Sequence, residues 1–88
     1  GCEAALASAL AELPIKAVRR CSRNTGVTTG DPMTLRLGRG ASGKLEVKVL
    51  ASSGSRDFDG CLAQALAQRH LPTTKPTRCQ RVIGYRVP

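Results

Sequence analysis

The sequence predicts an α+β fold, a two-layer sandwich in which helices cover one face of a three-stranded antiparallel sheet. Three observations predict it. Two regions carry helical patterning, a pair of alternating apolar and polar runs is joined by a Gly-rich link, and a β-rich run ends the chain. The 88 residues suffice for one domain with a thin core, and they contain one Phe, one Tyr and no Trp.

The first helical region covers the start of the chain. Residues 3–11 are rich in Ala and Leu, which favour helix. Pro14 interrupts them, and because proline is tolerated in a first helical turn, we expect a helix to restart there and continue to Arg23. Ile15, Val18 and Cys21 or Ser22 recur at helical spacing and predict its buried stripe.

A β-hairpin follows. Residues 33–37 and 44–49 alternate apolar and polar side chains, and residues 38–43 between them are rich in glycine. Residues 38–44 also fit most of a phosphate-binding loop. That motif needs Ser or Thr next and then a helix, whereas here Leu45 follows and begins a strand, so we interpret the segment as a turn.

A second helical region begins after a serine-rich loop. Ser53 or Ser55 is the expected N-cap, and Asp57 and Asp59 fall in the first turn, where the helix dipole favours carboxylates. The two aspartates are two residues apart and point in different directions, so they do not predict an acid–base pair. We expect the helix to end near Pro72. The strongest apolar stripe of the chain lies here, at Phe58, Cys61, Leu62, Ala65 and Leu66.

Residues 79–87 predict the last strand. It follows a helix that crosses over from the hairpin, so it should run parallel to the second strand. A right-handed crossover then places it beside the first strand, in the order 2-1-3. The last strand is therefore an edge, whose outer backbone groups are open to pairing with another chain.

The four cysteines, Cys2, Cys21, Cys61 and Cys79, have spacings that match no zinc template. An even number in a short chain predicts two disulfides, and three pairings are possible. Cys21 and Cys61 each lie on the inner stripe of a helix, which favours Cys21–Cys61 and leaves Cys2–Cys79. The alternative is four reduced thiols in a cytosolic protein. Disulfides indicate a periplasmic or extracellular location.

The formal net charge is +8, from 14 Lys and Arg against 6 Asp and Glu. Arg36 and Lys48 should point away from the helices and make the open face of the sheet basic. Such a face predicts an acidic partner, or a nucleic acid or other anionic polymer; it is also typical of a solvated surface. Two aromatic residues leave little for base stacking, so nucleic acid is the second candidate.

The sequence does not indicate an enzyme. His70 is the only histidine, it lies near a helix end, and no nucleophile is spaced to use it. No apolar run is long enough to span a membrane. We expect no cofactor, no metal and no small-molecule substrate.

Several short segments resemble one known family, the TonB C-terminal domain family. They are residues 13–21, a turn at 41–43, residues 47–54, 58–61 and 70–72, and Gly84 with Tyr85. The similarity is to its cysteine-bearing branch, found in gliding-motility and other envelope proteins of myxobacteria. In that branch one Cys ends the first helix and one lies in the second, as Cys21 and Cys61 do. The chain departs from the pattern at Ser22, where an aromatic residue is usual, and at the additional Cys2 and Cys79.

The resemblance implies a non-enzymatic periplasmic protein-binding module of the bacterial envelope, whose last strand pairs with an extended segment of a partner, as in TonB-dependent transport. We expect residues 1–88 to form one such domain excised from a longer envelope protein, with a membrane link only through an anchor outside this sequence. The oligomeric state stays open. The matching partner-binding residues are Arg81, Val82, Ile83, Gly84, Tyr85, Arg86 and Val87.

Overall fold

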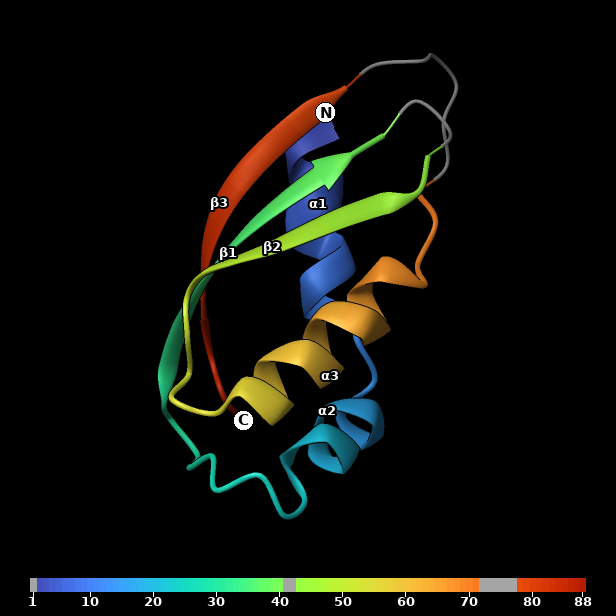
Figure 1. Ribbon diagram of the computed structural model, residues 1–88. Coiled ribbons are helices and arrows are strands. Elements are labelled where there is room, and N and C mark those ends of the chain that lie inside the picture. Colours follow the sequence, from blue (N-terminus) through green and yellow to red (C-terminus); the bar gives the residue numbers. More distant parts are fainter. Residues whose placement is uncertain (1, 41–42, 72–77) are drawn as a thin grey trace.

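The computed structural model describes residues 2–40, 43–71 and 78–88. Its elements in chain order are α1 (Cys2–Ala11), α2 (Ile15–Ser22), β1 (Pro32–Arg39), β2 (Leu45–Ala51), α3 (Arg56–Ala67) and β3 (Cys79–Arg86). The predicted α+β sandwich is confirmed: the sheet is antiparallel in the order β2-β1-β3, with the helices on one face (Figure 1). Residues 41–42 of the expected turn and 72–77 of the expected linker lie outside the described residues.

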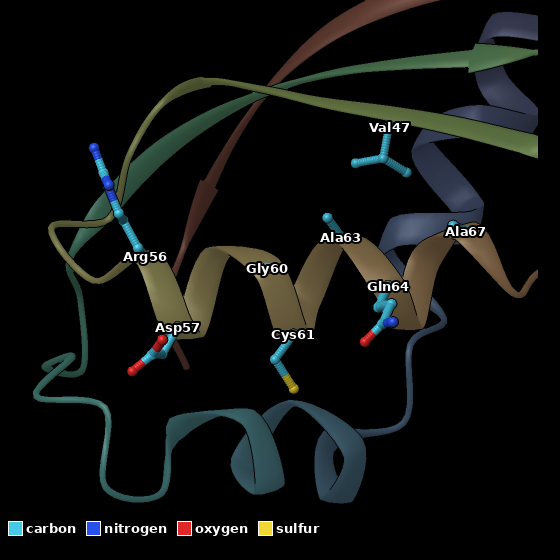
Figure 2. Close-up of a pocket in the computed structure, with 8 residues that line it drawn as sticks. All are labelled: Val47, Arg56, Asp57, Gly60, Cys61, Ala63, Gln64 and Ala67. Carbon is cyan, nitrogen blue, oxygen red and sulfur yellow. The ribbon is translucent and has the colours of Figure 1, made fainter.

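The first helical region is two helices with different positions. Pro14 separates them, and its carbonyl accepts hydrogen bonds from the N–H groups of Ala17 (2.9 Å) and Val18 (3.3 Å). α1 packs against β3 and β1, whereas α2 packs against α3. We expected the second helix of this region to lie beside α3 on the sheet. Instead α2 lies on the side of α3 away from β2 (Figure 2), because the break at Pro14 turns the chain off the sheet.

The register of the sheet decides which side chains face the helices. In β1, Met33, Leu35 and Leu37 are buried, so the odd-numbered residues face the helices and the even-numbered ones lie on the open face. β1 pairs with β2 around Arg36↔Lys48 and with β3 around Arg36↔Val82. The three side chains therefore share the open face, as expected for Arg36 and Lys48.

One hydrophobic core joins the helices to the sheet. Phe58 lies in it with no exposed surface and supplies its largest side chain. α3 packs against β2 and α1 packs against β3 and β1, and burial of apolar side chains between these helices and the sheet stabilises the domain. The other buried apolar side chains are Leu6, Ala9, Leu10, Val18, Cys21, Met33, Leu35, Leu37, Leu45, Leu62, Leu66 and Val87.

Both predicted disulfides are present. Cys2–Cys79 joins the start of α1 to the start of β3, with Cα atoms 6.2 Å apart. Cys21–Cys61 joins α2 to α3, with Cα atoms 5.4 Å apart. Cys61 points toward α2 rather than the sheet (Figure 2), which follows from the position of α2 beneath α3. Cross-links across 77 and 40 residues restrict the unfolded chain strongly, which offsets the small core.

Candidate functional site

Within the part of the chain that the structure describes, the outer edge of β3 presents unpaired backbone N–H and C=O groups at alternate residues. Val87 N–H donates to the carbonyl of Asp31 (3.0 Å), and Gly40 N–H donates to that of Lys44 (3.1 Å). Both bonds fix the same alternation, in which odd-numbered residues of β1 bond to β3 and even-numbered ones to β2. The outward-pointing N–H and C=O groups of β3 thus belong to Gln80, Val82, Gly84 and Arg86. Among the described residues, none of these backbone groups has a hydrogen-bond partner.

The edge formed by β2 is partly covered. Leu45 N–H donates outward to the carbonyl of Arg69 (3.4 Å), and Leu71 N–H donates to that of Gly43 (3.0 Å). α3 ends at Ala67, earlier than expected, because residues 68–71 turn to bond with the start of β2. α3 also packs against β2. Of the two edges, β3 is the more accessible to a further strand.

The predicted partner-binding residues divide between the two faces of β3. Val82, Gly84 and Arg86 lie on the open face, and the Val82 side chain is 58% exposed. Ile83 and Tyr85 are half-buried against the core. Arg81 and Arg86 are both held by backbone carbonyls. Arg81 Nη1 donates to Glu3 O (3.4 Å) and Arg86 Nη1 to Gly30 O (3.1 Å).

Val87 and Tyr85 hold β3 against the core. Val87 lies beyond the end of β3 with its side chain buried, its N–H donates to Asp31 O, and its carbonyl accepts from Gly30 N–H (2.7 Å). Its backbone is therefore not available to a partner. Burial raises the pKa of the Tyr85 hydroxyl above its usual value.

The open face is basic at its centre. Arg36 and Lys48 are directly opposite on neighbouring strands, an arrangement that destabilises a sheet through like-charge repulsion. They line a hollow of about 120 Å³ together with Gly38, Glu46 and Gln80. Among the described residues the only ion pair joins Arg69 to Glu12 (3.7 Å), so neither Arg36 nor Lys48 forms one, although Glu46 lines the same hollow. An anionic group placed here would remove the repulsion.

The serines before α3 form a hydrogen-bonded cluster with Asp59, and the sequence predicted the N-cap but not the bonds to Asp59. Ser55 is the N-cap, its hydroxyl accepting from Phe58 N–H (3.2 Å). Asp59 is buried, and its carboxylate accepts from the N–H (3.1 Å) and hydroxyl (2.6 Å) of Ser53 and from the hydroxyl of Ser52. Burial alone would raise the pKa of Asp59, but the hydrogen bonds outweigh it and lower the pKa below its usual value. The signal was the serine run before the helix, and the role of the cluster is structural.

A depression of about 700 Å³ lies along α3 beside β2. Its polar side chains do not converge on one point. In Figure 2 Val47 points into it from β2, whereas Asp57 and Cys61 point away from the sheet and Arg56 extends beyond the start of α3. Cys61 is disulfide-bonded and therefore not a nucleophile. The groove offers no arrangement that supports catalysis.

The residues that the structure describes contain no group of three or more His, Cys, Asp or Glu side chains that could hold a metal ion. None of their helices is long and apolar enough to cross a bilayer. His70 contributes a backbone bridge to Lys44, at the start of β2. The two disulfides are compatible with a secreted or envelope protein.

Comparison with family models, with curated proteins and with solved structures gives no match to this chain.

Proposed function

We propose that this chain is a non-enzymatic protein-binding module of the bacterial envelope that takes an extended partner segment onto the edge of β3. The observation that carries the proposal is the set of unpaired backbone groups along β3, at Gln80, Val82, Gly84 and Arg86. A segment aligned there gains main-chain hydrogen bonds at every second residue, as in other complexes formed by strand addition. The same segment, 81–87, is the one implicated by the resemblance to TonB C-terminal domains.

The framework behind β3 supports this role because it holds the strand in place. Cys2–Cys79 fixes its beginning, and the bonds of Val87 to Gly30 and Asp31 fix its end. A strand fixed at both ends loses little conformational freedom when a partner binds, which favours affinity. The two disulfides also support a periplasmic location over the cytosol.

Arg36 and Lys48 favour a second candidate function, binding of nucleic acid or another anionic polymer. Their unneutralised pair lies on an exposed sheet face. Other positive charges lie away from this face: Lys16, Arg19 and Arg20 are on α2, which packs beneath α3 on the helical side (Figure 1). The cations therefore do not form one continuous track for a polymer backbone, and strand addition is preferred.

A matched pair of proline variants tests strand addition. Random dodecapeptides displayed on phage are selected on the disulfide-bonded domain, and the enriched peptides are synthesised for titration. Val82→Pro removes an outward N–H that has no partner in the sheet, so the fold should persist while peptide affinity falls at least about tenfold. Ile83→Pro removes an inward N–H that bonds β1, so it should instead destabilise the domain.

Three results would count against the proposal. Unchanged peptide affinity in a folded Val82→Pro variant would show that binding does not use the β3 edge. Failure to enrich any peptide would contradict a peptide-binding module. Retention on heparin and on DNA with an equally steep salt dependence, unaffected by Val82→Pro, would favour the polymer-binding alternative.

A further inference from the structure

Gly84 interrupts the row of side chains that β3 presents on the open face. Among the described glycines, positive φ angles occur at Gly26, Gly30, Gly43 and Gly54 but not at Gly84. The backbone conformation at Gly84 therefore does not require glycine. A Cβ added at Gly84 would meet no atom within 4 Å, so packing does not require it either. Glycine inside a strand lowers stability relative to alanine. At Gly84 neither the backbone conformation nor the packing offsets this loss.

The missing side chain leaves an open place on the sheet surface. Gly84 pairs with Thr34 of β1, and Val82 and Arg86 are its neighbours along the open face of β3. Val82 is 58% exposed and is the most exposed of the large apolar residues described. Arg36 lies next to Val82 on β1. A planar apolar side chain fits this setting, because it can cover the glycine, contact the valine and stack on guanidinium groups.

The backbone places a partner residue at this point. Gly84 N–H and C=O point outward, so a strand added to β3 has one residue directly opposite Gly84. The side chain of that residue falls on the open face, because directly opposed residues of neighbouring strands share a face, and this face has space beside Gly84. Side chains of the added strand two positions away then come near Arg86 and toward Arg36. Neither arginine has a carboxylate partner among the described residues.

We infer that the partner is an acidic extended segment with an aromatic side chain seated over Gly84 and a carboxylate within two positions of it. This inference rests on the proposed function and specifies the chemistry of its partner. Gly84 is then a specificity-determining position, and the positive charge of Arg36 and Arg86 selects against basic segments.

The test substitutes Gly84 by Thr, which fills the open place and favours strand, and by Ala, which fills it less. Leu50→Thr, at an exposed position of β2 on the opposite edge of the sheet, is the control. Peptides selected on the unmodified domain are expected to contain Phe, Tyr or Trp with Asp or Glu two residues away. Gly84→Thr should lower the affinity of these peptides by about tenfold, and Gly84→Ala should lower it by less. The melting temperature of both variants should be unchanged or raised. Leu50→Thr should leave the affinity within about twofold.

The outcomes separate this inference from the proposed function. Peptides that lose affinity on Val82→Pro but tolerate Gly84→Thr would overturn the inference and leave strand addition standing. A lower melting temperature for both Gly84 variants would show that the glycine serves the fold, which also overturns it. Peptides insensitive to Val82→Pro would overturn the proposed function, and the inference with it.

Discussion

Ser53 donates two hydrogen bonds to the carboxylate of Asp59, one from its hydroxyl (2.6 Å) and one from its backbone N–H (3.1 Å). The pair closes the loop between β2 and α3, and Ser52 adds a third bond from its hydroxyl. Gly54, between the serines and the N-cap, has φ +99°, a conformation that glycine adopts without strain. The loop that begins α3 is therefore held by one ionised side chain.

Asp59→Asn should lower the free energy of unfolding by about 1–3 kcal/mol, because the amide keeps the shape but loses hydrogen bonds to a charged acceptor. Asp57→Asn is the matched control, since Asp57 lies in the same first turn but is exposed. It should change stability by about 0.5 kcal/mol or less. Urea unfolding of both variants measures the difference, and equal effects would contradict the role of the Ser53–Asp59 pair.

The same pair predicts acid sensitivity. The pKa of Asp59 is lower in the folded state than in the unfolded chain, so the carboxylate stabilises the fold at pH values above its unfolded value of 3.8. This contribution is lost as the pH falls from there through the lowered folded value. Urea unfolding between about pH 6 and about pH 2 should show a loss of stability that is smaller in Asp59→Asn. An identical pH dependence in both proteins would contradict it.

Lys48→Glu should stabilise the domain by about 0.2–1 kcal/mol, because it replaces a like-charge pair with an opposite-charge pair across from Arg36. Arg78→Glu makes the same charge change at an exposed position before β3, outside the paired strands, and is the control. Unfolding at low and high salt measures both. A gain of the same size in the two variants would mean that only the net charge matters.

Each disulfide should contribute about 2–4 kcal/mol to stability. Replacing Cys21 and Cys61 by Ala, or Cys2 and Cys79 by Ala, gives two variants that denaturant unfolding compares with the parent protein. Proteolysis without reductant followed by mass spectrometry should recover the pairs Cys2–Cys79 and Cys21–Cys61. Recovery of any other pairing would contradict the structure.

Much of the fold follows from local patterns in the sequence. Alternation at 33–37 and 44–49 predicted the hairpin, and the handedness of the crossover placed β3 beside β1. The pairing of Cys21 with Cys61 was also predicted correctly, although its geometry was not. A stripe along one helix shows which residues are buried but not against which element, so α2 was expected on the sheet rather than beneath α3.

The candidate site was predictable as an edge but not in its details. Strand order alone places residues 81–87 at the edge of the sheet. Which N–H groups point outward depends on register, which only the pairing of β1 with β3 decides. The space beside Gly84 and the burial of Asp59 depend on neighbours distant in sequence, and no local pattern indicates them.

Hydrogen exchange along β3, measured with and without a selected peptide, tests strand addition most directly. In the unbound domain, amides that bond β1 should be protected and outward amides should exchange quickly, in strict alternation. The protected amides are those of Arg81, Ile83 and Tyr85, and the quickly exchanging ones are those of Gln80, Val82, Gly84 and Arg86. Bound peptide should slow the outward amides by at least about tenfold and leave the inward ones unchanged. Outward amides that still exchange quickly in the presence of saturating peptide would contradict strand addition.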